Sequence, residues 1–194
     1  ATLFTLGLPG STYLYQGEEL GLPEVLELPG DARQDPVWFR TQGREIGRDG
    51  CRVPIPWSGD VASYGFGPCE NSWLPQPDTW EHLSVQAQES GDTTLNFYRD
   101  ALAQRREEQA TGDGEFEWRM DEFTHPNDAI LAYRRPHPTN PLTCIVNTED
   151  GMWRVPQSFG TDVLISSGPE VAVVDSGDGE HLVLGPETAV WVRN

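Results

Sequence analysis

The segment "GRDGCRVPIPW", residues 47–57, carries the side chains with the greatest capacity for binding chemistry in this chain. Arg48 and Arg52 lie four residues apart, and Asp49 lies between them. A guanidinium is a rigid fork of hydrogen-bond donors that matches a carboxylate or a pair of hydroxyl groups. Two roles therefore stay open on these residues alone: an internal ion-pair network that stiffens the loop, or a clamp that holds a ligand.

Proline and tryptophan surround these arginines. Pro54 and Pro56 restrict the backbone, so we expect a stiff corner. Trp57 closes the segment, and Trp73 follows in the next stretch of chain. Either ring could be a platform on which a sugar stacks, but packing is more typical of the residue type.

Two adjacent acids, Glu18 and Glu19, follow the segment "STYLYQG" at 11–17. The alternation of that segment predicts a short buried strand, and polar side chains at the carboxyl end of a barrel strand tend to face an active site. Neighbouring residues on an extended chain point to opposite sides, so these two cannot form a catalytic pair. The alternative is structural: one carboxylate bonds nearby backbone and the other is solvated.

Cysteine and histidine give no sign of a metal or cofactor site. The three cysteines are too scattered for a disulfide framework or a metal site, and we expect buried thiols in a reducing, cytoplasmic compartment; they are Cys51, Cys69 and Cys144. The four histidines have no ligand partner at metal-binding spacing; they are His82, His125, His137 and His181. Two of these, His125 and His137, precede proline and are expected in turns.

The charge of the chain excludes several classes of partner. Its net charge is −18, from 31 acidic and 13 basic residues, and all the basic residues are arginine. No basic stripe is present to neutralise phosphates, so we expect no nucleic-acid partner. No signal peptide or membrane span is visible, and we expect no membrane partner.

The chain divides into two regions with different sequence patterns. Its apolar opening at 1–10 is typical of the end of a buried helix, and it starts without methionine or a helix cap, so we expect a piece of a longer polypeptide. Residues 90–110 predict a helix, capped by Ser90 or Asp92. Between them, the proline- and glycine-rich stretch from 18 to 89 shows neither helical nor strand-like hydrophobic periodicity. Such a long irregular segment is usually functional when it is ordered.

Beyond residue 110, seven short strand candidates alternate with turns. This spacing favours a small antiparallel sandwich or barrel. The candidates are "EFEWRM", "AILAYRR", "LTCIVNT", "DVLISS", "VAVVD", "HLVLG" and "TAVWVRN". We therefore predict an α/β part at 1–110 and an antiparallel β-sandwich domain at 111–194.

Four ordered motifs resemble glycoside hydrolase family 13, the α-amylase superfamily, in its α-glucosidase and oligo-1,6-glucosidase branch. "LGLPGSTYLYQGEELGL" is similar to the eighth-strand region of that family's (β/α)8 barrel, and "RDGCRVPIPW" to a segment of the loop after it. "GFG…SWLPQP" and "LNFYRDALAQRRE" resemble the continuation of the loop and the last barrel helix. The resemblance implies that residues 1–110 are the C-terminal part of a TIM barrel.

The resemblance also implies roles for single residues. Arg48 would bind the terminal glucose of the substrate, with Arg52 as its support or substitute. The pocket around them would be shaped by Tyr15, Glu18, Glu19 and Trp57. The family's three catalytic carboxylates follow earlier barrel strands, so no catalytic residue is expected in this chain. The usual "TPM-x-W" is "VPIPW" here, a departure at Val53 and Pro56 that leaves the arginines in place.

The predicted function is therefore that of the C-terminal portion of a retaining exo-α-glucosidase, inactive by itself. Its expected partners are a small α-gluco-oligosaccharide and the N-terminal part of the same barrel, with no cofactor and no metal. Two alternatives remain open. One is a transglucosylase or sucrose isomerase of the same family, and the other is a non-catalytic carbohydrate-binding module built from the β domain.

Overall fold

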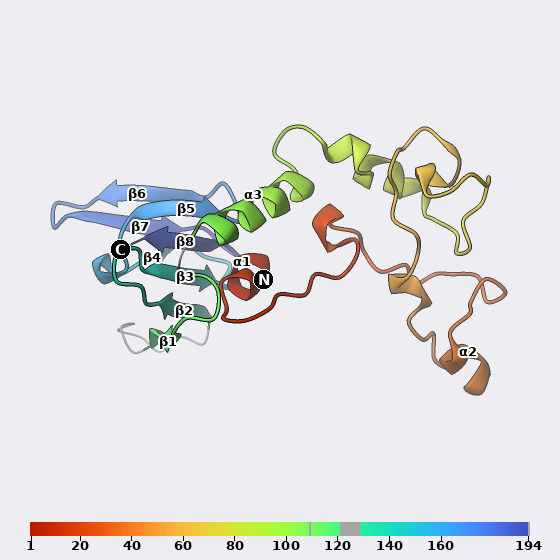
Figure 1. The fold of residues 1–194 in the computed structure, drawn as a ribbon, viewed down its shortest axis with the longest axis horizontal. Helices are drawn as coiled ribbons and strands as arrows, with labels where there is room; N and C mark the ends of the chain where they lie inside the picture. The colour runs from red at the N-terminus through yellow and green to blue at the C-terminus, as the bar shows by residue number, and fades with distance from the viewer. Residues whose placement is uncertain (109, 121–128, 194) are drawn as a thin grey trace. The chain divides into compact units, whose positions relative to one another are not determined.

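The computed structural model describes residues 1–108, 110–120 and 129–193 (Figure 1). Contacts group the chain into two compact units, which are described separately. One, called the β unit, contains Ala1–Tyr13 and Arg99–Asn194, and the other, called the loop unit, is Leu14–Tyr98. The boundary expected near residue 110 divides the sequence differently, and it stays a prediction.

The β unit contains two antiparallel sheets, as the spacing of the strand candidates predicts. All seven candidates form strands, and one two-residue strand, β4, was not predicted. The first sheet has the order β1 (Glu117–Trp118), β2 (Ile130–Arg135), β3 (Leu142–Asn147), β8 (Ala189–Arg193) and β5 (Asp162–Ser166). The second has the order β4 (Trp153–Arg154), β7 (Glu180–Leu184) and β6 (Val171–Asp175).

One apolar core contains side chains from both sheets, which makes the β unit a sandwich. Alternate residues of β2, β8 and β7 supply it, because successive side chains of a strand face opposite ways. Its buried members are Ile130, Ala132, Ile145, Val155, Phe159, Leu182, Leu184, Val190 and Val192. Val155 and Phe159 come from the link after β4, where the short helix η7 (Gln157–Phe159) lies. The predicted sandwich is confirmed.

Helix α1 (Thr2–Leu6) packs against β3 and β8 in the same unit. Its apolar side is fully buried through Leu3 and Leu6. The indole of Trp191 donates to the carbonyl of Leu3 at 2.9 Å, and the hydroxyl of Tyr133 donates to that of Phe4 at 2.7 Å. The helix predicted at the start of the sequence is therefore confirmed. Hydrogen bonds from two side chains of the first sheet hold it in place.

The long helix α3 runs over Thr94–Glu107, within the predicted 90–110. Its cap is neither Ser90 nor Asp92, because the hydroxyl of Thr93 accepts the amide of Asn96 at 3.3 Å and so caps the first turn. In the parts of the chain that the structure describes, no helix has the length and apolar character needed to cross a membrane.

The loop unit contains short helices and no strand. They are η1 (Glu18–Leu20), α2 (Pro36–Arg40), η2 (Asp49–Cys51), η3 (Ala62–Gly65), η4 (Asp78–Leu83) and η5 (Gln86–Gln88). A small buried cluster of Leu28, Val53, Leu74 and Trp80 forms its core. The unit is thus ordered around one apolar cluster, although most of its backbone is irregular.

The strand predicted at 11–17 is wrong for this structure. These residues have no regular secondary structure apart from a turn at the end, and Tyr13 is 91% exposed. A strand needs a neighbouring strand to bond its amides and carbonyls. None of the described strands pairs with this segment.

The sandwich core leads to a first prediction. Leu184→Ala should lower the free energy of unfolding by about 2–5 kcal/mol, because a fully buried leucine leaves a cavity when it is truncated. Val173→Ala on β6 is the matched control: this side chain is half exposed, and its loss should cost less than about 1 kcal/mol. Urea denaturation followed by circular dichroism measures both, and equal losses would contradict the position of the core.

Candidate functional site

The arginine-rich loop is held by two buried carboxylates. Asp49 begins helix η2, and one of its oxygens accepts the backbone amides of Gln34 and Asp35, both at 2.9 Å. Its side chain is almost completely buried. These two hydrogen bonds tie the segment at 34–35 to the start of η2.

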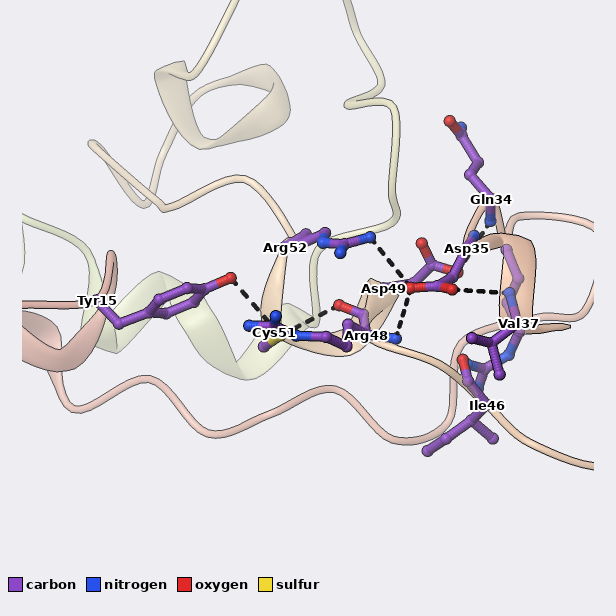
Figure 2. A network of polar contacts seen from close by, with 10 residues as sticks. Tyr15, Gln34, Asp35, Val37, Ile46, Arg48, Asp49, Cys51 and Arg52 are labelled. Carbon is purple, nitrogen blue, oxygen red and sulfur yellow. Dashed lines mark hydrogen bonds and ion pairs between the residues drawn. The ribbon is translucent and has the colours of Figure 1, made fainter.

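Asp35 makes the reciprocal connection (Figure 2). One of its oxygens accepts the amide of Val37 at 2.9 Å and caps helix α2. The other oxygen accepts the amide of Arg48 at 3.0 Å and the Arg52 guanidinium at 3.1 Å. The segment that begins helix α2 and the arginine-rich loop are therefore joined by hydrogen bonds to the Asp35 side chain rather than by strand pairing.

Two glycines permit this close approach. Gly47 has a φ of +67°, and a Cβ there would lie 2.6 Å from the carboxyl carbon of Asp35. Gly50 lies against the backbone of Val25, whose amide donates to the carbonyl of Gly50 at 3.1 Å. A Cβ on Gly50 would lie 2.4 Å from the carbonyl oxygen of Val25. A larger residue at either position would push the loop away from its supports.

An open cavity of about 300 Å³ lies beside this network in the loop unit. It brings together three of the predicted residues, Tyr15, Glu18 and Arg48. Cys51 and Trp80 line it too. The hydroxyl of Tyr15 points to the Cys51 sulfur at 3.7 Å, and the thiol donates to the Arg48 carbonyl at 3.1 Å (Figure 2).

The polar neighbours of the Arg48 guanidinium are uncharged groups of the cavity, Cys51 and Tyr15. The Arg48 side chain is exposed, and among the described residues no carboxylate lies within ion-pair distance of it. The pKa of Arg48 is raised, mainly by a hydrogen bond with the Cys51 side chain and also by the Tyr15 hydroxyl. The pKa of Tyr15 is raised as well, chiefly by its hydrogen bond with Cys51. Arg48 is thus cationic and Tyr15 neutral near pH 7.

The other predicted site residues lie outside the cavity. Arg52 is bound to Asp35, as the ion-pair reading of the loop predicts, and it does not line the cavity. Glu19 accepts the amide of Gly17 at 2.9 Å, whereas Glu18 lines the cavity. Trp57 is half exposed.

Two residues that matter here were not among the predictions. Asp35 precedes proline at the start of α2, and this order is a recognisable cap signal. Trp80 has no such signal, because its role depends on the packing of segments distant in the sequence. Its side chain is 2% exposed, and its indole nitrogen has no hydrogen-bond partner among the described residues.

The cysteine and histidine predictions have mixed outcomes. Cys144 is buried as expected, and burial raises its pKa to about 12. The expectation was wrong for Cys51, which is partly exposed, and for Cys69, which is exposed, because both lie on loops of the loop unit. His137 lies in the irregular link between β2 and β3, where its ring nitrogen accepts the amide of Asn140 at 3.2 Å.

His125 lies outside the described residues. In the described parts of the chain, no group of three or more histidine, cysteine or acidic side chains is arranged to hold a metal ion.

The geometry can be compared with known proteins. The model of the α-amylase catalytic domain matches residues 1–114, which is more than half of the chain and includes every residue of the cavity. The chain belongs to the α-amylase family. This confirms the resemblance seen in the sequence, and with it the fold: the C-terminal end of a (β/α)8 barrel followed by an antiparallel β domain.

Relatives in the α-amylase family include several glucosidases. A probable α-glucosidase of Rhizobium meliloti is 34% identical over 147 residues, 75% of this chain and 25% of the relative. A glucan 1,6-α-glucosidase of Streptococcus dysgalactiae subsp. equisimilis is 25% identical over 187 residues, 86% of this chain and 32% of the relative. The chain therefore spans between a quarter and a third of the length of these relatives.

Solved structures of the family superpose on nearly the whole chain. An α-glucosyl transfer enzyme has a TM-score of 0.75 at 27% identity and covers 100% of this chain and 34% of its own. The trehalulose synthase MutB of Pseudomonas mesoacidophila MX-45 has a TM-score of 0.76 at 20% identity and covers 98% of this chain and 37% of its own. The second similarity is one of fold.

The carboxylate network predicts an acid transition in this α-amylase-family chain. The amides of Val37 and Arg48 hold the pKa of Asp35 below its ordinary value of 3.8. A carboxyl whose pKa is lower in the folded chain stabilises the fold above its unfolded pKa, and this contribution disappears as the pH falls through the folded value. The amide resonances of Val37 and Arg48 should therefore shift together at a midpoint below pH 3.8 in an NMR titration.

Asp35→Asn is the control for this titration. The amide cannot titrate, so the same two resonances should lose the acid-dependent shift. A midpoint at or above the ordinary carboxyl pKa in the unsubstituted protein would contradict the proposed stabilisation of the charged form.

Proposed function

We propose that this chain is the C-terminal portion of a retaining, exo-acting α-glucosidase that hydrolyses short α-linked gluco-oligosaccharides. The observation that carries the proposal is the position of Arg48, whose guanidinium lines an open cavity without a carboxylate partner among the described residues. Its backbone is meanwhile fixed by Asp35. Relatives described as α-glucosidase and oligo-1,6-glucosidase support the substrate class.

In this proposal Arg48 binds a terminal hydroxyl of the glucose unit at the non-reducing end. A guanidinium can donate two parallel hydrogen bonds, so it fixes the orientation of the sugar as well as its position. Tyr15 and Glu18 line the same cavity and offer a hydroxyl and a carboxylate to other hydroxyl groups. Because the loop is pinned, a longer chain beyond the terminal glucose would collide with it, which accounts for exo-action.

The catalytic carboxylates come from outside this chain in the proposal. One attacks the anomeric carbon and forms a glucosyl ester, while the other protonates the leaving oxygen. The second carboxylate then takes a proton from water, whose oxygen displaces the ester. The chain supplies the binding loop to the N-terminal part of the same barrel, and by itself it is expected to be inactive.

Replacing Arg48 tests the proposal directly. In the complete protein, Arg48→Ala should lower kcat/KM for small α-glucosides by roughly 10- to 150-fold, because a hydrogen bond to a charged group contributes about 1.5–3 kcal/mol. The thermal unfolding temperature should stay close to that of the parent, since the Arg48 backbone and not its side chain anchors the loop.

Arg44→Ala is the matched control, because Arg44 is an exposed arginine of the same loop outside the cavity. Its kcat/KM should be unchanged. Near-normal kcat/KM in Arg48→Ala would remove Arg48 from the site.

A second candidate reaction is transfer of the glucosyl group to a sugar. The α-glucosyl transfer enzyme, similar to this chain at 27% identity, favours it, as does a trehalose synthase/amylase of Mycobacterium tuberculosis that is 33% identical over 141 residues. Both reactions pass through the same glucosyl ester and differ in the acceptor, water or sugar.

Product analysis separates these reactions. Hydrolysis predicts free glucose as the main product at low sugar concentration, with transfer products increasing only as the sugar concentration rises. Isomerised or elongated sugars that dominate even at low concentration would identify a transglucosylase or sucrose isomerase instead. Chromatography of the early products of the complete protein on maltose, isomaltose and sucrose gives the answer.

A carbohydrate-binding module in the β domain has less support. Trp191 is fully buried, and Trp153 packs against the sandwich core. Trp118 is exposed but already packs edge-on against Phe116, with ring centroids 5.1 Å apart. Among the described residues of the β domain, Trp118 is therefore the one largely exposed tryptophan, and it already contacts Phe116.

A further inference from the structure

Arg48 has a fixed backbone but a side chain without an ionic anchor. Its amide donates to Asp35 at 3.0 Å, and among the described residues no carboxylate lies within ion-pair distance of its guanidinium. A long side chain of this kind loses rotamer freedom when a ligand fixes it, and this loss opposes binding. A neighbour that limits the freedom of the guanidinium beforehand would therefore increase the affinity of the candidate site.

Cys51 has the contacts for this role (Figure 2). Its thiol donates to the carbonyl of Arg48 at 3.1 Å, and the hydroxyl of Tyr15 donates to its sulfur at 3.7 Å. A hydrogen bond with the same side chain is the main cause that raises the pKa of Arg48. Tyr15, Arg48 and Cys51 all belong to the loop unit, and all three line one cavity. One sulfur atom therefore contacts the backbone and the side chain of Arg48 as well as Tyr15.

The directions of these hydrogen bonds decide what the sulfur can do. A thiol has a single proton to donate, and its sulfur is a weak acceptor. The carbonyl of Arg48 takes that proton. The lone pairs of the sulfur are then left for two donors, the hydroxyl of Tyr15 and the guanidinium of Arg48. The backbone thus orients the thiol, and the sulfur acts as an acceptor toward the groups of the cavity.

A weak acceptor suits a guanidinium that must bind a ligand. Arg52 shows the alternative, because its ion pair with Asp35 at 3.1 Å commits that side chain to the fold. Hydrogen bonds between two charged groups are stronger than those to a neutral partner. A carboxylate at position 51 would therefore compete with the hydroxyl groups of a ligand, whereas a sulfur atom holds the guanidinium and releases it readily.

Helix η2 fixes the position of the sulfur. Cys51 is the last residue of this helix, and the amide of Arg52 closes its turn by donating to the carbonyl of Asp49 at 2.9 Å. The amide of Val25 donates to the carbonyl of Gly50 at 3.1 Å, which ties the same helix to a second segment. The thiol is therefore carried by backbone that is hydrogen-bonded on more than one side.

We propose that Cys51 is a positioning residue for Arg48, whose sulfur holds the guanidinium in the cavity in the orientation that binds a terminal sugar hydroxyl. Cys51 acts through Arg48 and touches no reacting atom. The consequence for sugar binding rests on the proposed function, whereas the orientation of the guanidinium exists without any ligand. The two parts of the proposal are therefore tested by different measurements.

The first measurement needs no substrate. In the complete protein labelled with 15N-arginine, the Nε–H resonance of Arg48 is identified by its absence from Arg48→Ala. We expect its heteronuclear NOE to fall in Cys51→Ala, because a guanidinium without its acceptor moves more on the picosecond-to-nanosecond timescale. Cys51→Ser keeps a donor and an acceptor, and it should keep most of the NOE. Equal values in the parent and in Cys51→Ala would overturn the proposal.

The second measurement is a double-mutant cycle on the hydrolysis of small α-glucosides. Cys51→Ala should lower kcat/KM roughly 2- to 12-fold, as the loss of one neutral hydrogen bond does, and mainly through a higher KM. In the Arg48→Ala background the same substitution should have no further effect, because Cys51 acts only through Arg48. Losses that add in the double variant would overturn the proposal, since they would place the action of Cys51 on the fold or directly on the sugar.

Cys69→Ala is the matched control, because Cys69 is an exposed cysteine of the loop unit that does not line the cavity. Its kcat/KM and the NOE of Arg48 should equal those of the parent. Near-normal kcat/KM in Arg48→Ala would contradict the proposed function, while the NOE would still decide whether Cys51 orients Arg48. Either proposal can therefore fail without the other.

Discussion

Two buried carboxylates hold together a part of the chain that has no sheet. Asp35 and Asp49 each accept backbone amides from a segment distant in sequence, and Asp35 also accepts a guanidinium. In an ordinary α/β domain, strands supply this long-range hydrogen bonding. In the loop unit, hydrogen bonds to these two buried side chains join segments that strands would otherwise connect, so the shape of the arginine-rich loop depends on them.

The two arginines of the loop contact this network in different ways. Arg52 completes the Asp35 network and is thereby committed to the fold, whereas Arg48 contributes only its backbone amide to that network. Its guanidinium is left to the cavity beside Tyr15 and Glu18. A binding group gains precision when the backbone that carries it is rigid, because less freedom is lost when the ligand arrives. The loop thus contains the ion-pair network that the sequence left open, and the binding role of Arg48 stays a proposal.

Prediction from sequence succeeded where the signal is local. The seven predicted strands of the β domain follow from alternation and turns within each segment. The strand expected at 11–17 failed because a strand also depends on partners that its own residues do not encode. At the candidate site, motif matching proposed Tyr15, Glu18 and Arg48, which lie together around one cavity. Trp80 completes that cavity through packing alone, for which the sequence carries no pattern.

Helix α1 belongs by packing to the β sandwich, although the catalytic-domain family model includes it. Trp191, Tyr133 and Arg135 donate hydrogen bonds to carbonyls of residues 3, 4 and 7. Consider a chimera that joins the β domain to another enzyme at residue 114, where the match to the catalytic-domain model ends. It would lose helix α1 and leave these buried donors unpaired, and each unpaired donor would lower the stability by about 1–3 kcal/mol. The sandwich is therefore not an interchangeable module: a chimera would have to inherit the opening decapeptide together with the strands that cover it.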